Sequence, residues 1–227
     1  AAAVRDGDVA KALALLHEGG EGFTWIDPLA NRDALAALGT AVAAHAHSMV
    51  SAALEGDVVK ALTLKAQMQV LSATRAGQLG VREWNTAIET QLGQSAAHTW
   101  YAGRPILVTR NDAALNLANG DVGVVCMVNG ERRAFFGSPD DPIDISIARL
   151  PHVETVHALT IHKSQGSEYE SVVVVLPTVA SRITTRELLY TGVSRPTKSL
   201  TIVATEAAIR AAVATMVRRA TGLATRL

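Results

Sequence analysis

Two polar segments, each next to a predicted strand, contain the side chains best able to do chemistry in this chain. The first is segment 160–168 (TIHKSQGSE), which follows a strand predicted over 156–160. Ligands of open α/β sheets bind at the carboxyl ends of the strands, where Thr160, His162 and Lys163 would emerge. These side chains can hydrogen-bond phosphate groups or stack on a base. A solvated loop with a glycine turn explains the same residues equally well.

The second segment is 186–195 (RELLYTGVSR), a predicted helix that ends near an arginine. Pro196 prevents the helix from continuing, and a strand follows. The planar guanidinium of Arg195 could hold phosphate oxygens as a fork. The alternative is a surface arginine that the helix dipole favours at a helix C-terminus, and from these residues alone it is the stronger reading.

Several other kinds of site are disfavoured by the residues present. A phosphate loop ends in Gly-Lys-Ser or Gly-Lys-Thr, and neither Lys163-Ser164 nor Lys198-Ser199 follows a glycine. His45 and His47 are two positions apart on a predicted helix, so they point to different faces and no metal site is expected. The single cysteine, Cys126, excludes a disulfide scaffold and fits a reducing cytoplasm.

Composition sets the class of protein. The chain has 227 residues, of which 48% are hydrophobic and 19% are charged, so it can bury a sizeable core. Its 21 basic and 21 acidic residues balance, which excludes a strongly basic nucleic-acid coat but allows a local basic cleft. No apolar run approaches the roughly 20 residues of a membrane helix, so no membrane partner is expected.

The elements that position the two segments follow from the spacing of apolar residues. Residues 1–69 are predicted to be helical, with helix starts at Asp8 and Asp57, and a last helix runs from Thr205 to Gly222. The other predicted helices are 32–55, 81–92 and 186–193. The predicted strands of the α/β part are 70–74, 156–160, 172–176 and 200–204. This alternation is typical of an α/β fold with a parallel sheet.

Residues 101–150 are predicted to be all-β. Asn129-Gly130 between two β-rich runs is the strongest short signal for a hairpin. The strands predicted here are 105–109, 122–128, 133–136 and 144–148. Their number and short length suggest a small barrel that is inserted into the α/β unit and folds independently of it.

Four ordered segments resemble parts of superfamily 1 DNA helicases. Segment 160–168 is similar to motif V and segment 186–195 to motif VI, and residues 70–75 followed by 80–85 are similar to motif IV. Residues 103–112 and 119–123 resemble the start of the barrel that is inserted in that family. Within the superfamily, the ordered set most resembles the RecD family, the alpha subunits of exodeoxyribonuclease V (the RecBCD complex).

The resemblance implies an α/β fold in which a RecA-like parallel sheet is interrupted by an SH3-like β-barrel. Residues 1–98 would hold a helical N-terminal segment and the first part of the second RecA-like domain, residues 99–150 the barrel, and residues 151–227 the rest of that domain. In this family the phosphate loop and the acidic Mg²⁺ motif lie on a preceding RecA-like domain. The chain is therefore expected to be a C-terminal portion that is inactive alone.

The resemblance also implies residue roles. ATP with Mg²⁺ would be bound mainly by the preceding domain, and two arginines of this chain would reach its γ-phosphate and act in catalysis. The implied nucleotide-binding residues are these two, Arg75 and Arg195, together with Gly166 and Glu168, whose carboxylate would accept from the ribose. The implied residues along single-stranded DNA are Thr160, His162 and Lys163, with Asn111 as a weaker candidate.

The activity implied is that of a cytoplasmic, ATP-dependent DNA helicase in double-strand break repair and recombination, with RecB-like and RecC-like subunits as partners. One departure concerns motif VI, because family members tend to follow its arginine with further basic residues, whereas this chain has Pro196-Thr197-Lys198. Two alternatives stay open. The chain could be a non-catalytic module that binds DNA and docks subunits, or a part of a standalone superfamily 1 helicase.

Overall fold

The computed structural model describes residues 1–94, 99–179, 181 and 183–217 of the chain. Its helices are α1 (Ala2–Asp6), α2 (Val9–Glu18), α3 (Arg32–Leu54), α4 (Val58–Gln67), α5 (Val81–Gln91), α6 (Arg186–Val193) and α7 (Glu206–Ala214). Its strands are β1 (Phe23–Ile26), β2 (Met68–Ser72), β3 (Pro105–Val108), β4 (Val122–Val128), β5 (Glu131–Ser138), β6 (Asp141–Ser146), β7 (Val153–Thr155), β8 (Ala158–Thr160), β9 (Tyr169–Val175) and β10 (Pro196–Val203). Short 3-10 turns, η1 (Ile147–Arg149) and η2 (Ile161–Ser164), follow β6 and β8. None of the helices in these ranges is long and apolar enough to cross a membrane.

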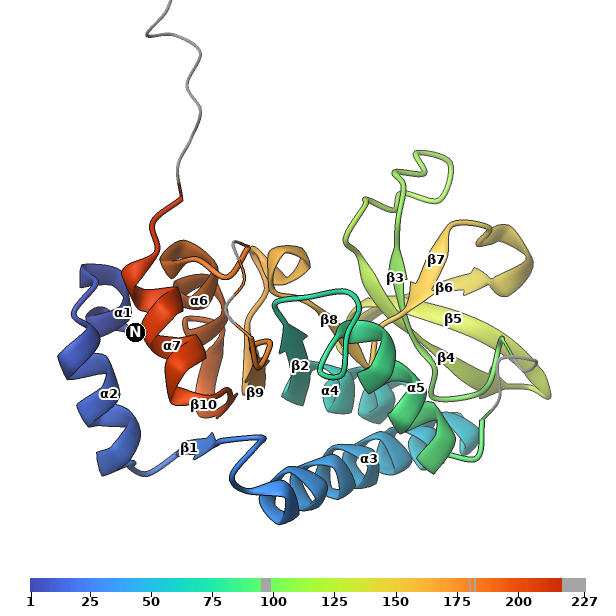
Figure 1. Cartoon of the computed structure of the whole chain (residues 1–227). Coiled ribbons are helices and arrows are strands. Elements are labelled where there is room, and N and C mark those ends of the chain that lie inside the picture. Colours follow the sequence, from blue (N-terminus) through green and yellow to red (C-terminus); the bar gives the residue numbers. More distant parts are fainter. Residues whose placement is uncertain (95–98, 180, 182, 218–227) are drawn as a thin grey trace, which may run out of the picture.

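Five strands form a parallel sheet in the order β1-β10-β9-β2-β8 (Figure 1). Successive side chains of a strand point to opposite faces of a sheet. In β9, Val172 and Val174 therefore pack with α1, α2, α6 and α7, whereas Val173 and Val175 pack with α3 and α5. Because helices cover both faces, β9 is apolar throughout its second half. The predicted α/β class with a parallel sheet is confirmed.

Capping hydrogen bonds confirm three of the predicted helix starts. Side-chain oxygens of Asp8, Asp57 and Thr205 accept from the backbone N–H three residues further on, at 2.9, 3.0 and 3.1 Å. Each bond satisfies one N–H that has no partner within its own helix. The last helix differs from the prediction at its other end, because α7 stops at Ala214. Gly222, where it was expected to end, lies outside the described residues.

The N-terminal segment is not wholly helical, contrary to the prediction. β1 is an edge strand of the parallel sheet and pairs with β10, from Phe23 opposite Leu200 to Ile26 opposite Val203. Its sequence, Phe-Thr-Trp-Ile, consists of the aromatic and β-branched types that are enriched in strands. The strand is short, and its partner is distant in the sequence, so helical spacing on either side concealed it.

A second, antiparallel sheet has the order β6-β5-β4-β3-β7 (Figure 1). The predicted hairpin at Asn129-Gly130 joins β4 to β5, and its φ angles of 52° and 79° are the left-handed values of the tight hairpin turn that Asn-Gly favours. In the part of the chain that the structure describes, β6 and β7 are the two edges of this sheet. The strand predicted over 156–160 is shorter in the structure, because β8 begins at Ala158. The strand before it, β7, was not predicted, and the chain passes from β7 in the antiparallel sheet to β8 in the parallel sheet.

The antiparallel sheet shares a core with the helices of the parallel unit. Val124, Cys126 and Phe135 are buried against α3 and α4. The residues that α3 and α4 contribute are Met49, Ala52, Ala53, Ala61 and Leu62. The small side chains of the three alanines let the sheet approach the helices closely. The independent folding of the inserted strands stays a prediction, and this shared core argues against it.

Candidate functional site

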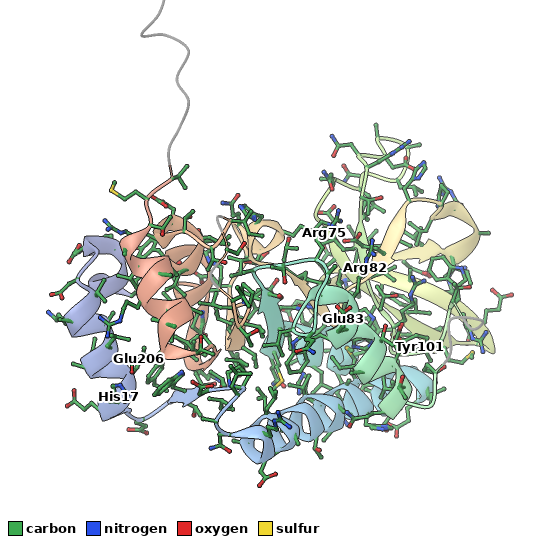
Figure 2. The ribbon with its side chains drawn as sticks, viewed as in Figure 1. His17, Arg75, Arg82, Glu83, Tyr101 and Glu206 are labelled. Atoms are coloured by element: carbon green, nitrogen blue, oxygen red, sulfur yellow. The ribbon has the colours of Figure 1, made fainter. Side chains whose placement is uncertain are left out.

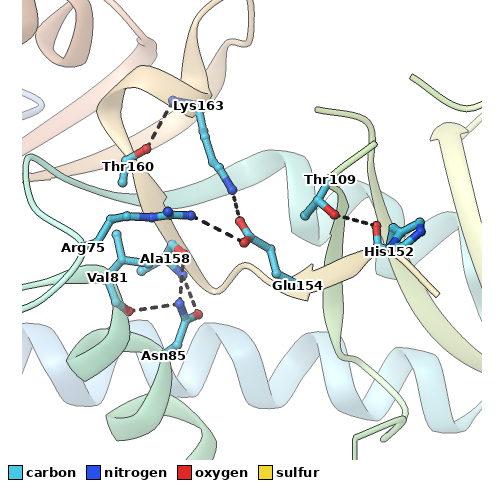
Figure 3. Close-up of polar contacts among 9 residues, drawn as sticks. All are labelled: Arg75, Val81, Asn85, Thr109, His152, Glu154, Ala158, Thr160 and Lys163. Carbon is cyan, nitrogen blue, oxygen red and sulfur yellow. Dashed lines mark hydrogen bonds and ion pairs between the residues drawn. The ribbon is translucent and has the colours of Figure 1, made fainter. Parts of the chain in front are cut away.

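A groove of about 450 Å³ lies where the carboxyl ends of β2 and β8 meet β7 of the antiparallel sheet (Figure 3). It brings together residues from segments that are far apart in the sequence. Its polar lining consists of Arg75, Arg82, Asn85, Thr86, Glu154, Thr155, Thr160 and Lys163. The groove thus joins the strand–loop–helix unit β2–α5 to the first half of segment 160–168.

The loop between β2 and α5 is fixed by its own backbone. The N–H of Val81 donates to the carbonyl of Thr74 at 3.0 Å, and the N–H of Arg82 donates to the carbonyl of Arg75 at 3.1 Å. Gly80 is required at the turn, because a Cβ there would lie 2.7 Å from a backbone atom of the same loop. These contacts hold Arg75 and Arg82 next to each other at the groove (Figure 2).

Asn85 of α5 binds the outer edge of β8. Its amide oxygen accepts from the N–H of Ala158 and its amide nitrogen donates to the carbonyl of the same residue, both at 3.0 Å (Figure 3). The amide nitrogen also donates to the carbonyl of Val81 at 3.0 Å. A side-chain amide therefore takes the place of a neighbouring strand, and it holds α5 and β8 at a fixed distance on the floor of the groove.

One carboxylate holds two of the groove's three cations. Glu154 of β7 accepts from the ammonium of Lys163 through one oxygen, and its other oxygen lies 3.8 Å from the guanidinium of Arg75 (Figure 3). Arg82 forms no ion pair with the residues that the structure describes. The groove therefore carries more positive than negative charge. No motif of the sequence pointed to Glu154, and only its register on β7, opposite Leu107 of β3, places it here.

The residues predicted to contact DNA do not all lie in this groove. Thr160 and Lys163 line it, and the Thr160 hydroxyl accepts from the N–H of Lys163 at 3.4 Å at the start of η2. His162, on the same turn, is exposed. Asn111 lies instead on a loop of the antiparallel sheet, where its side-chain oxygen accepts from the N–H of Asn119 at 2.7 Å.

Arg195 lies directly before β10, at the amino edge of the parallel sheet. Its three side-chain nitrogens donate to the carbonyls of Thr191 and Ser167 and to the hydroxyl of Ser194, at 3.0, 3.1 and 3.1 Å. A guanidinium has five N–H donors, so two remain after these bonds. Gly166 and Glu168 flank Ser167 and are both exposed, and the φ of 86° at Gly166 is one that glycine adopts without strain.

The structure separates Arg75 from Arg195, which the resemblance placed on one γ-phosphate. Arg75 follows the carboxyl end of β2, whereas Arg195 precedes the amino end of β10, and all strands of this sheet run parallel. The two arginines therefore lie at opposite edges of the sheet. Arg75 lies in the groove with Lys163, and the expectation that both arginines contact one γ-phosphate stays a prediction.

A second groove adjoins the amino edge of β9. It has a volume of about 430 Å³, and its walls include Glu168 and Tyr169, Lys65 of α4, and Asp121 before β4. The ammonium of Lys65 donates to Gln69 at 2.6 Å and lies 5.3 Å from the ring centre of Tyr169. Burial lowers the pKa of Lys65 to about 8. Glu168 thus lines the same groove as a lysine that is costly to keep charged.

Comparison with known proteins gives a family for part of the chain. Residues 155–203 match the family model of the UvrD-like helicase C-terminal domain. This range contains both polar segments, 160–168 and 186–195.

No group of three His, Cys, Asp or Glu side chains that could hold a metal ion occurs among the described residues.

Individual relatives extend the match. The RecBCD enzyme subunit RecD of Mycolicibacterium smegmatis is 43% identical over 231 aligned residues, which cover 100% of this chain and 40% of that protein. The ATP-dependent RecD2 DNA helicase of Deinococcus radiodurans is 29% identical over 56% of this chain and 19% of that protein. A crystal structure of Pif1 helicase from Bacteroides in complex with ADP-AlF3 and ssDNA covers 75% of this chain and 48% of that one, with 15% identity and a TM-score of 0.41, too distant to support an inference.

The chain spans less than half the length of the first of these relatives. The match is to the C-terminal part of that protein and includes the helicase C-terminal segment. From its first residue to its last, the chain is therefore similar to the C-terminal part of the RecD subunits of RecBCD enzymes.

Proposed function

We propose that this chain is the second motor domain of an ATP-dependent DNA helicase of the RecD type. It binds single-stranded DNA in the groove at the carboxyl edge and presents Arg195 to ATP and Mg²⁺ that a preceding domain binds. One observation carries the DNA-binding part of this proposal. Three cations, Arg75, Arg82 and Lys163, converge on one groove, and phosphate contacts by such side chains dominate the affinity for nucleic acids.

We further propose that the parallel sheet is a RecA-like domain and that the antiparallel sheet is its SH3-like barrel insert. The division into residues 1–98, 99–150 and 151–227 follows the same proposal, with β7 extending the insert to Thr155. The whole protein would act with RecB-like and RecC-like subunits in recombination and repair. The similarity to RecD subunits over the entire chain supports these assignments.

The nucleotide side of the proposal rests on Arg195, Glu168 and Gly166 at the amino edge. The two donors that Arg195 keeps free of intrachain bonds can hold the γ-phosphate as a fork. Glu168 is exposed beside it and can accept from a ribose hydroxyl. The chain has no Gly-Lys-Ser or Gly-Lys-Thr loop, so turnover of ATP requires another domain.

Segment 160–168 offers a physical link between the two sides. The segment begins at Thr160 in the DNA groove and ends at Glu168 near Arg195. The guanidinium of Arg195 donates to the carbonyl of Ser167, directly before Glu168, at 3.1 Å. Between these ends, Ile161 and Val174 pack against Gly192 of α6, where a Cβ would lie 3.4 and 3.2 Å from them. A shift of Arg195 when the nucleotide is cleaved would therefore move the segment that carries Lys163.

Binding of a fluorescein-labelled oligo(dT) to the purified chain tests the DNA groove. Lys163→Ala should weaken binding and make the plot of log affinity against log salt shallower, because one phosphate contact is lost. Lys198→Ala is the matched control. Lys198 is an exposed lysine near the amino end of β10, away from the groove, and like Lys163 it pairs with a glutamate. Equal affinities of the two variants would contradict the groove assignment. Binding that responds to neither substitution nor nucleotide would favour the docking-module alternative.

A further inference from the structure

Glu154 occupies the place between two cations of the groove that a phosphate group would need. One carboxylate oxygen contacts Lys163 of η2 and the other faces Arg75 of the β2–α5 loop (Figure 3). The two cations come from different loops of the parallel unit, whereas the carboxylate comes from the antiparallel sheet. Two oxygens that share one charge and each face one cation reproduce the way a phosphate engages a pair of basic side chains.

This ion-pair cluster contributes little to the stability of the fold. The side chains of Lys163, Glu154 and Arg75 are 29%, 36% and 69% exposed. Pairs as exposed as these typically stabilise a protein only weakly. The backbone at Glu154 is held independently, because β7 pairs with β3 at Leu107. The contacts with Glu154 therefore act mainly on the charge of the groove.

We propose that Glu154 is an internal competitor of the nucleic-acid phosphate for Lys163 and Arg75. This inference rests on the proposed function of the groove as a DNA site. In the free protein the carboxylate contacts Lys163 and Arg75 and offsets one of their two positive charges, and Arg82 is the groove cation that has no ion pair among the described residues. A phosphate that enters the groove displaces the carboxylate. Lys163 and Arg75 then lose their contact with Glu154 of the antiparallel sheet and gain contacts with DNA.

The competition has a signature in the salt dependence of binding. Phosphates that are neutralised by cations release their counterions, and the slope of log affinity against log salt measures the net release. A displaced carboxylate takes up cations from solution and so reduces that net release. Binding by the natural chain is therefore weaker, and its salt dependence shallower, than the three cations alone would give.

The experiment compares Glu154→Gln with Glu83→Gln, using fluorescein-labelled oligo(dT) and a series of salt concentrations. Both substitutions remove one negative charge. Glu83 is exposed on the first turn of α5, next to Arg82, but it does not line the groove (Figure 2). We expect Glu154→Gln to tighten binding about fivefold and to steepen the salt slope. We expect Glu83→Gln to change the affinity less than twofold. Thermal melting confirms that both variants fold.

A double variant separates this inference from the proposed function. If Lys163→Ala weakens binding and abolishes the gain from Glu154→Gln, the competition is supported. If Lys163→Ala weakens binding but Glu154→Gln behaves like Glu83→Gln, the groove binds DNA and the inference is overturned. If neither the natural chain nor any variant, Glu154→Gln included, binds DNA, the proposed function is wrong and this inference is wrong with it.

Discussion

The hydroxyl of Tyr101 lies 2.7 Å from Nε2 of His157, and this contact joins the two places where the chain passes between the sheets. Tyr101 precedes β3, and His157 stands between β7 and β8. Both side chains are buried, and the carbonyl of His157 accepts from the amide of Gln69 in β2 at 3.0 Å. The crossing points are thus joined by polar contacts within the protein, and the two sheets pack as one unit.

The buried imidazole makes stability depend on pH. Burial, with the nearby charges of Lys65 and Arg104, lowers the pKa of His157 to about 3, whereas an unfolded chain has a histidine pKa of about 6.5. Between these values the unfolded chain binds a proton that the folded chain does not. The free energy of unfolding should therefore fall as the pH drops below about 6.5, by at most about 1.4 kcal/mol per pH unit.

Urea unfolding of the natural chain and of His157→Gln at several pH values measures this effect. The variant should show a flatter dependence on pH. His47→Gln is the control, because His47 is exposed, and it should keep the full dependence. Parallel curves for the natural chain and His157→Gln would show that this imidazole does not titrate as described.

The core shared by the sheets should make the whole chain unfold together. Phe135 of β5 is buried against α3 and α4, so Phe135→Ala should cost about 3–5 kcal/mol. Thermal unfolding should remain a single transition at a lower temperature, with hydrogen exchange accelerated in α3 as well as in β5. Ile143→Ala, at a site that is 40% exposed on the same sheet, should have a small effect. Two separate transitions, with only one shifted, would mean that the antiparallel sheet is an independent domain.

We expect the amide of Asn85 to be needed to hold β8 against α5 beside the groove. Asn85→Ala leaves the N–H and carbonyl of Ala158 without their partners, which should cost about 1–3 kcal/mol. Faster hydrogen exchange at the Ala158 amide would locate the loss. Thr86→Ala, an exposed change in the same helix, controls for helix propensity. Unchanged protection of the Ala158 amide would show that the side chain does not hold β8.

Arg195 should matter more for turnover than for nucleotide binding in a protein that joins this chain to a phosphate-loop domain. An arginine on the γ-phosphate stabilises the transition state, and such residues raise rates by about 10³–10⁵ in related phosphoryl transfers. Arg195→Ala should reduce the ATPase rate accordingly, and Arg195→Lys should restore little of it, because an ammonium lacks the planar fork. Steady-state ATPase rates with saturating single-stranded DNA, together with nucleotide affinity, test this.

The three intrachain hydrogen bonds of Arg195 require a further control. Arg195→Ala also removes the contact with Ser167, so thermal melting must show how much stability is lost. Arg210→Ala, an exposed arginine on α7, provides the comparison. A near-normal rate in Arg195→Ala would identify Arg195 as a structural residue that holds segment 160–168.

The sequence predicted correctly those helix starts and turns that depend on interactions between residues close together in the chain. The caps at Asp8 and Asp57 and the hairpin at Asn129-Gly130 are set within a few residues, and each is confirmed. β1 was missed because it forms only by pairing with β10, far along the chain. β7 was missed for the same reason, since it forms only by pairing with β3.

The candidate site was predictable in part. Similar motifs identified Thr160, Lys163 and Arg195 but did not indicate which edge of the sheet each occupies. That signal was present in the order of elements, because Arg75 follows a strand whereas Arg195 precedes one, and parallel strands put these positions at opposite edges. Arg82 lies within the segment similar to motif IV but was not singled out there. Glu154 has no motif of its own, and its place in the groove depends on the pairing of β7 with β3 in the antiparallel sheet.

The amide of Asn85 also covers part of one edge of the parallel sheet. β8 is a free edge of the parallel sheet, and an edge with unpaired N–H and carbonyl groups is a template on which another chain can add a strand. By occupying both groups of Ala158, Asn85 removes the first pairing position of a three-residue strand. The same side chain that shapes the groove therefore leaves fewer unpaired backbone groups on β8 with which another chain could pair.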